Sequence, residues 1–254
     1  MKKYRNILSL SYSIAKANFK IRNEGSYLGI LWYLLNPLSF FLIILYIRGA
    51  LLSSGTIISY YPVYLLMGLI MMNFFNQLVS TSINLVQNNA QLIKSIKIPQ
   101  ETLVIAIVLQ SIFSHIFELL LLIILFIYFH LSLLGIIFYL AVFIFYVFFA
   151  LGFSFIATVL GAYFNDLGNI WIIFSQLLFF FTPVFYVASL GSRIYLGNLG
   201  NPLFYFLTVA RDVSIYSMIP AWWMMIIPVL VSFCSLSLGI LIFNKYKRRF
   251  AEMV

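Results

Sequence analysis

Long apolar runs are the feature that most constrains how this chain folds. Six of them reach the ~20 residues that a helix needs to cross a lipid bilayer. Of the 254 residues, 64% are hydrophobic and only 8% are charged, whereas soluble domains carry about 25% charged residues. Such a chain cannot cover a water-facing surface. We predict an all-α integral membrane protein, because the runs are too long and too uniformly apolar for barrel strands.

The predicted organisation is a single transmembrane domain that covers residues 1–254. The six transmembrane helices are expected at 28–52, 62–86, 102–129, 133–160, 169–189 and 222–243. In chain order we expect an amphipathic interfacial helix at 1–26, spans one to five within 28–189, an outer region at 190–221, the sixth span at 222–243, and a tail at 244–254.

Basic residues set the expected orientation. Twelve of the 15 lysines and arginines lie in the N-terminal stretch, in the loop 87–101 or in the tail. The positive-inside rule places these three segments, and therefore both termini, in the cytoplasm. This orientation accounts for the net charge of +9 without a nucleic-acid partner.

The N-terminal stretch has an apolar and a basic face at helical spacing. This pattern predicts a helix that lies flat among the lipid headgroups, and an ordinary basic anchor is the alternative. Beyond it, Trp32 and Tyr33 suit the aromatic belt, and Pro37 can kink the first span. The apolar face holds Ile7, Leu10, Ile14, Ala17 and Ile21, and the basic face holds Arg5, Lys16 and Lys20.

Two segments between spans need a further explanation. In the loop 87–101, Leu92, Ile93 and Ile96 form an apolar stripe that requires a partner surface, either the membrane or another protein. In the outer stretch 190–221, the apolar run 203–210 is too short to span. A re-entrant gate and an interfacial loop are both compatible with that run.

Ionisable residues within the third span indicate a polar contact. His115 and Glu118 are three residues apart and therefore lie on one face of a helix. They could form a proton relay, but one pair lacks the chain of carriers that pumps use, so we favour a structural contact between helices. Asp166, in a short turn, is expected to cap a helix.

The sequence carries no signature of an enzyme that acts alone. It has no nucleotide-binding loop, no H-E-x-x-H motif, no nucleophile elbow and only one cysteine. We therefore predict no catalytic residue, no metal site and no cofactor in this chain.

Four segments, in order along most of the chain, resemble the permease subunits of ABC exporters for surface polysaccharides. "RNEGSYLGILWYLLNPL" resembles the N-terminal signature of that family. "LIKSIKIPQETLV" resembles its Lys-(hydrophobic)-Pro segment, "FFFTPVFYV" its Pro-aromatic motif late in span five, and "GNPLFYFLTVARDV" its outer NP…R stretch. The matching residues of the first segment are Arg22, Ser26, Leu28, Gly29, Trp32 and Pro37.

The resemblance implies a homodimer of six-span subunits with two separate ATPase subunits, which bind ATP and Mg. It implies a multi-pass protein of the bacterial inner (cytoplasmic) membrane. The cargo would be an undecaprenyl-diphosphate-type glycolipid, carrying an O-antigen of lipopolysaccharide or a teichoic acid, exported through an aromatic-lined channel. Where the family often has a basic residue before the aspartate of the turn, this chain has Asn165.

The resemblance also implies re-entrant outer helices within 190–221, a coupling helix within 87–101, and roles for individual residues. The expected ATPase-coupling residues are Gln91, Lys94, Lys97 and Pro99. Arg5, Lys16, Lys20 and Arg22 are expected to meet the diphosphate headgroup at the cytoplasmic entrance. Channel or gate candidates are Trp32, Tyr33, Tyr46, Phe181, Tyr186 and Arg211.

Three other functions remain open from the sequence. The same architecture serves ABC permeases for drugs or small lipids. A proton-coupled carrier would use His115 and Glu118. A membrane scaffold would transport nothing.

Overall fold

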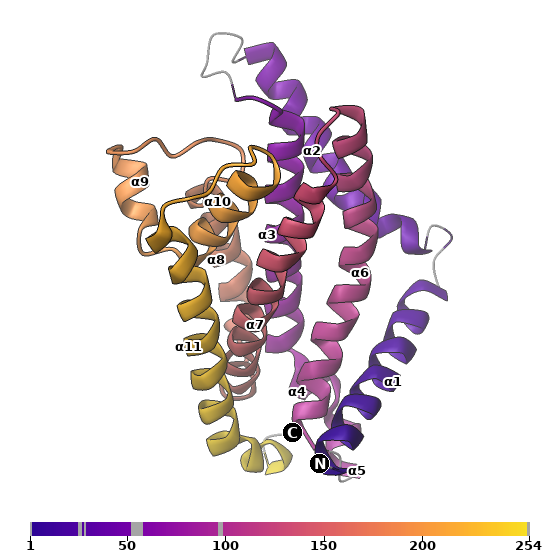
Figure 1. The fold of residues 1–254 in the computed structure, drawn as a ribbon. Helices are drawn as coiled ribbons and strands as arrows, with labels where there is room; N and C mark the ends of the chain where they lie inside the picture. The colour runs from indigo at the N-terminus through magenta and orange to yellow at the C-terminus, as the bar shows by residue number, and fades with distance from the viewer. Residues whose placement is uncertain (1, 25–26, 28, 52–57, 96–98, 253–254) are drawn as a thin grey trace.

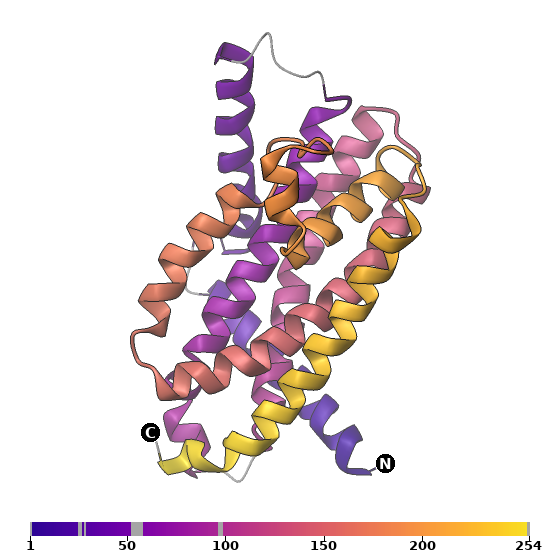
Figure 2. The same cartoon turned by 90° about the vertical axis from the view of Figure 1, so that its left-hand side faces the viewer.

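The computed structural model describes residues 2–24, 27, 29–51, 58–95 and 99–252, and these residues form helices and turns with no strand (Figures 1 and 2). The all-α prediction is therefore confirmed for this part of the chain. The elements are α1 (Lys2–Glu24), η1 (Gly29–Leu31), α2 (Trp32–Leu51), α3 (Tyr61–Ile83), α4 (Leu85–Asn88), α5 (Ala90–Ser95), α6 (Glu101–Tyr128), α7 (Leu134–Tyr163), α8 (Leu167–Phe181), α9 (Arg193–Asn198), α10 (Pro202–Ser214), α11 (Trp222–Tyr246) and η2 (Lys247–Glu252).

Four helices, α3, α6, α7 and α11, are long and apolar enough to cross a membrane. Their bounds agree to within three residues with the predicted spans two, three, four and six. Two shorter apolar helices, Leu34–Gly49 within α2 and Leu167–Phe181, occupy the positions predicted for spans one and five. A membrane-embedded helical protein is thus supported, and the count of six spans stays a prediction.

Helix α3 forms the centre of the bundle. In the apolar 18-residue stretch of α3, 78% of the residues are buried. The corresponding share in the other three long helices is 22–39%. Helices α2, α6, α7, α8 and α10 all pack against α3. The core beside it is aromatic: Phe75 stacks on Phe149 with ring centroids 5.5 Å apart, and Phe74 meets Phe143 edge-on at 5.0 Å. This central position gives α3 neighbours on every side.

Helices α7 and α11 form the most extensive helix pair. At their crossing, a Cβ atom on Gly239 would overlap the backbone of Gly152, and one on Gly152 would overlap the backbone of Ser235. Small residues allow this close approach, which matters in lipid because packing replaces the hydrophobic driving force. The hydroxyls of Ser232 and Ser235 donate to the carbonyl oxygens of Phe145 and Phe149 across the same contact.

Helix α8 ends earlier than the predicted span 169–189. Its last residue is Phe181, and Thr182 has extended backbone angles. The cause is Pro183, because a proline disfavours helical angles in the residue before it and cannot donate a backbone hydrogen bond. The chain then passes through the region predicted to be re-entrant, where α10 packs against α3, α7 and α11.

Both termini, α4, α5 and η2 lie at the same end of the bundle (Figures 1 and 2). Helices α4 and α5 therefore share an end with the N-terminal helix and the C-terminal η2, and the membrane topology itself stays a prediction. Helix α1 lies along α6, and the hydroxyl of Ser11 donates to the carbonyl oxygen of Thr102 at 3.0 Å. Ser11 and Ala15 are the buried positions of α1, one step from the predicted apolar face, while Leu10 and Ile21 remain exposed.

Candidate functional site

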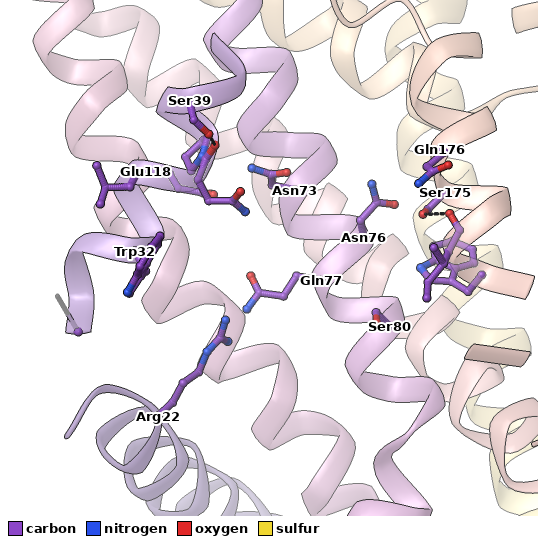
Figure 3. Close-up of a pocket in the computed structure, with 16 residues that line it drawn as sticks. Arg22, Trp32, Ser39, Asn73, Asn76, Gln77, Ser80, Glu118, Ser175 and Gln176 are labelled. Carbon is purple, nitrogen blue, oxygen red and sulfur yellow. Dashed lines mark hydrogen bonds between the residues drawn. The ribbon is translucent and has the colours of Figure 1, made fainter. Parts of the chain in front are cut away.

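A polar cavity of about 830 Å³ opens between α2, α3, α6 and α8, with the end of α1 at its margin (Figure 3). Polar groups are unfavourable inside an apolar bundle unless they are paired or used. A concentration of them at one place therefore marks the candidate site of this protein. The polar lining residues are Arg22, Asn36, Ser39, Asn73, Asn76, Gln77, Ser80, Glu118, Ser175 and Gln176.

Helix α3 supplies a polar stripe to the cavity. Asn73, Asn76, Gln77 and Ser80 follow the i, i+3, i+4, i+7 spacing of one helix face, and Figure 3 shows them along one side of α3. The residues between them, such as Phe74, Phe75 and Leu78, are buried in the core on the other faces of the helix. The helical period therefore places the polar residues on the face that lines the cavity and the apolar residues on the faces that pack in the core.

The walls opposite α3 come from α2 and α8. The hydroxyl of Ser39 donates to the carbonyl oxygen of Asn36 at 2.8 Å, and that of Ser175 to the carbonyl oxygen of Ile172 at 2.9 Å. These hydroxyls are therefore satisfied within their own helices.

Three side-chain amides in the cavity are not satisfied in this way. No hydrogen bond joins the amides of Asn36, Asn76 or Gln176 to any other described part of the chain, and the Asn76 Oδ1 atom is buried without a partner. A buried acceptor without a partner is costly, by about 1–3 kcal/mol. The cavity thus offers free donors and acceptors to a polar ligand or to water.

Arg22 brings a positive charge to the cavity. When the amide of Gln77 turns its oxygen toward the guanidinium, it accepts from Nη1 of Arg22 at 2.6 Å and from Nη2 at 3.2 Å. The two side chains reach toward each other from α1 and α3 (Figure 3). A guanidinium held in this position can bind a phosphate group by two parallel hydrogen bonds.

Glu118 brings a negative charge to the same cavity. Its Oε2 atom lies 2.8 Å from Nδ1 of His115, so the two side chains do share one face of α6. On the other side of the ring, Nε2 of His115 lies 3.0 Å from the hydroxyl of Tyr139 on α7. Glu118 is 8% exposed and His115 is 1% exposed, so the pair is buried and its carboxylate alone lines the cavity.

Two tryptophans provide large aromatic surfaces. Trp32, at the start of α2, is 55% exposed, and Trp171, on α8, is buried against Phe75 and Phe153. Both line the cavity. Indole rings combine an apolar face with a polar N–H group, which suits contact with a ligand that has both apolar and hydroxylated surfaces.

The predicted entrance residues are only partly brought together. Arg22 lines the cavity, whereas Lys16 and Lys20 are exposed on α1 and Lys20 pairs with Glu24 at 3.2 Å. The side chain of Arg5 lies outside the described residues. Among the entrance residues whose side chains the structure describes, Arg22 alone reaches the cavity.

The predicted coupling residues lie at the end of the bundle that carries both termini. Gln91 and Lys94 are exposed on α5, and Pro99 is half-buried just before α6. Lys97 lies outside the described residues. The face of α5 that exposes Lys94 can meet a partner at this end, and no structural feature of the described chain identifies that partner.

Of the channel or gate candidates, Trp32 alone lines the cavity. Tyr46 is exposed on α2, and Phe181 lies at the end of α8. The hydroxyl of Tyr186 donates to the carbonyl oxygen of Phe180 at 3.2 Å, which satisfies backbone that the break at Pro183 leaves free. The side chain of Tyr33 lies outside the described residues.

Arg211 is a brace between elements and does not line the cavity. It is 2% exposed, and its guanidinium donates to the carbonyl oxygens of Tyr64, Pro183 and Val184 at 2.7–3.2 Å. These contacts join α10 to α3 and to the backbone that follows α8. Beside it on α10, burial raises the pKa of Asp212 to about 6, although the positive charge of Arg211 opposes that shift.

Sequence reasoning missed most of the cavity. The amide residues of α3 carried a readable signal, because Asn73, Asn76, Gln77 and Ser80 recur at helical spacing in an otherwise apolar run. The polar residues of α2 and α8 carried none, since each helix contributes only two of them within an otherwise apolar segment. In the described part of the chain, no three histidine, cysteine or acidic residues come close enough to hold a metal ion.

Comparison of the sequence with protein-family models and with curated proteins finds no match. The function must therefore be argued from the cavity and from the surfaces around it.

Proposed function

We propose that this chain is the transmembrane subunit of an ATP-driven exporter that moves a lipid-diphosphate-linked polysaccharide, of the O-antigen or teichoic acid type, outward across the bacterial cytoplasmic membrane. The cavity would be the share of the translocation path that one subunit contributes. The observation that carries the proposal is this amide-lined cavity, with an arginine and two indole rings in its walls.

The cavity suits each polar part of such a cargo. Arg22 suits the diphosphate, since guanidinium groups pair with phosphate by charge-assisted hydrogen bonds. The free amides of Asn36, Asn76 and Gln176 suit glycan hydroxyls, and the indoles of Trp32 and Trp171 suit the apolar faces of sugar rings. An apolar drug would leave these amides unpaired, and for that reason we place a drug exporter second.

The surfaces of α2 and α8 suit the lipid and a second copy of the chain. Trp171 is the single buried residue of α8, and Phe40 and Ile43 on α2 are exposed. In a membrane these faces meet either lipid or another subunit. A homodimer would cover them and enclose the cavity, while the bilayer beside α2 and α8 would take the polyprenyl chain.

The end of the bundle that carries α5 suits two ATPase subunits. ATP and Mg would be bound by these partners. Gln91 and Lys94 would transmit their closure to α6, which follows α5 in the chain, and through α4 to α3. This chain would then act without catalytic residues of its own.

The test is ATP hydrolysis by the complex that this chain forms with its co-purified ATPase in nanodiscs. We expect hydrolysis to rise several-fold when a polyprenyl-diphosphate-linked glycan is added, and not when phosphatidylglycerol is added. A chain that co-purifies with no nucleotide-binding subunit, or an ATPase indifferent to the glycolipid, would contradict the proposal.

A proton-coupled carrier is a candidate from a different class, because the buried chain of Tyr139, His115 and Glu118 ends at the cavity. Ionisable groups inside a membrane protein that reach a cavity are typical of proton relays. Such a carrier would move its cargo in proteoliposomes under a pH gradient with no ATPase present, whereas the exporter would not.

A further inference from the structure

Glu118 is a buried carboxylate that retains free acceptor capacity toward the cavity. An ionised carboxylate has two oxygens and about four acceptor positions. Nδ1 of His115 occupies one of them, with Oε2 of Glu118 at 2.8 Å. Among the described residues, Glu118 forms an ion pair with no lysine or arginine. The remaining positions face the space that Glu118 lines.

The groups behind Glu118 fix its position. When the carboxylate is ionised it only accepts, so Nδ1 of His115 carries the proton and Nε2 can accept from the hydroxyl of Tyr139, which lies at 3.0 Å. The imidazole also stacks on the ring of Phe143 with centroids 4.2 Å apart and meets Phe74 edge-on at 5.6 Å. The ring is thus held by two hydrogen bonds and two aromatic contacts.

A purely structural contact between α6 and α7 does not require a carboxylate at the wall of the cavity. The hydrogen bond between His115 and Tyr139 joins α6 to α7 without any carboxylate. Placing a carboxylate at the cavity wall adds a strong acceptor at a point where α2 and α3 contribute amides. Sites of this kind select ligands that donate hydrogen bonds, because a ligand that cannot donate leaves the buried acceptor unpaired.

We propose that Glu118 is the acceptor for hydroxyl groups of the first sugar ring of the cargo, with His115 and Tyr139 as positioning residues. This inference rests on the proposed function, because it takes the ligand to be a lipid-diphosphate-linked glycan. The cavity is within the range of ~300–1,000 Å³ that holds one compact ligand. A diphosphate bound at Arg22 therefore places its first sugar in the same enclosure as Glu118.

The test compares two probes on the full chain in nanodiscs: a polyprenyl diphosphate, and the same lipid diphosphate bearing one N-acetylhexosamine. Binding is followed by quenching of tryptophan fluorescence, since Trp32 and Trp171 line the cavity. We expect the sugar-bearing lipid to bind the wild-type chain at least about tenfold more tightly, the range of a hydrogen bond to a charged group.

Glu118→Gln should reduce that advantage to less than about threefold and leave the affinity for the bare lipid diphosphate unchanged. The glutamine retains the size of the side chain and can still accept from His115, but it turns an N–H donor group toward the cavity in place of an acceptor. Glu101→Gln is the matched control, because it makes the same change on α6 outside the cavity. It should leave both affinities unchanged.

Each other outcome has a defined meaning. If Glu118→Gln retains the advantage, or if the wild-type chain binds both lipids equally, the sugar subsite is overturned while the lipid-diphosphate function stands. If the wild-type chain binds neither lipid, the proposed function fails and the subsite fails with it. If Glu118→Gln does not fold, Glu118→Asp decides, since it withdraws the carboxylate from the cavity by one methylene: a full sugar advantage in that variant overturns the subsite, and a reduced advantage supports it.

Discussion

The guanidinium of Arg211 lies over the ring of Tyr64, with its central carbon 3.5 Å from the ring centroid, and also donates to the carbonyl oxygen of that residue. Two segments 147 residues apart in the sequence are joined by this contact. The same guanidinium holds the carbonyl oxygens of Pro183 and Val184. One side chain therefore satisfies backbone groups that lipid could not.

We expect Arg211→Met to destabilise the protein by at least ~1–3 kcal/mol, because it removes the described donor of the buried Val184 carbonyl group and the contacts that join α10 to Tyr64 and Pro183. The measurement is thermal unfolding of the purified chain in detergent. Arg193→Met is the control, since Arg193 is exposed on α9, and it should change stability little. Equal melting temperatures for the two variants would show that Arg211 is not a brace.

The crossing of α7 and α11 makes a second stability prediction. Gly152→Ala should lower the free energy of unfolding by about 1–3 kcal/mol, because the added Cβ meets backbone atoms of Ser235 that cannot move aside. At Gly49, on α2, a Cβ meets no atom. Gly49→Ala should therefore be neutral or slightly stabilising. Chemical denaturation of both variants checks this difference, and a harmless Gly152→Ala would contradict the close packing.

Asp212 makes a pH-dependent prediction. Its pKa is raised from 3.8 to about 6 in the folded protein, mainly by burial. A raised pKa means that the folded state prefers the protonated form, so the stability that this group contributes is present below pH ~4 and is lost as the pH rises through 6. Asp212→Asn should therefore raise the melting temperature at pH 8 and not at pH 4. An equal shift at both pH values would show that the charge is not responsible.

A substitution in the polar stripe of α3 is expected to reduce function without reducing stability. Asn76→Leu should reduce glycolipid-stimulated ATP hydrolysis at least about tenfold, while the melting temperature stays equal or rises, because the variant replaces a buried acceptor that has no partner. Measuring both quantities on the same preparation checks the prediction. Unchanged hydrolysis would mean that the cargo does not touch this stripe.

Arg22 and Lys16 provide a matched comparison of the predicted entrance residues. Arg22→Gln should weaken binding of polyprenyl diphosphate about tenfold or more, since it removes a charge-assisted hydrogen bond at the cavity. Lys16 is exposed on α1 and does not line the cavity, so Lys16→Gln should weaken binding less than twofold. Equal losses would indicate a diffuse attraction to the membrane surface in place of a site.

The sequence alone was sufficient to predict the long helices of the bundle, but it was not sufficient to predict the cavity. Apolar runs predicted α3, α6, α7 and α11 closely, because burial in lipid imposes a minimum length on each helix. The spacing of His115 and Glu118 predicted their shared face for the same local reason. Contacts between distant segments could not be predicted from local spacing. The hydrogen-bond partners of Arg211, for example, lie at residues 64, 183 and 184.

The early end of α8 shows a second limit of prediction from the sequence. Pro183 was visible in the sequence, but the apolar run 169–189 continued on both sides of it, and hydropathy alone joined the two halves. The tertiary contacts of Tyr186 and Arg211 allow the chain to leave the helix there, since they satisfy the freed carbonyl groups. A break of this kind depends on donors from elsewhere in the fold.

The central claim is that the cavity conducts a lipid-diphosphate-linked glycan, and photo-crosslinking in living cells tests it most directly. A photoreactive amino acid is placed at position 76, in the cavity, or at position 128, which is exposed at the end of α6. The adducts formed on illumination are then identified by mass spectrometry. We predict a polyprenyl-diphosphate glycan adduct from position 76 and none from position 128. Phospholipid adducts alone from position 76 would contradict the claim.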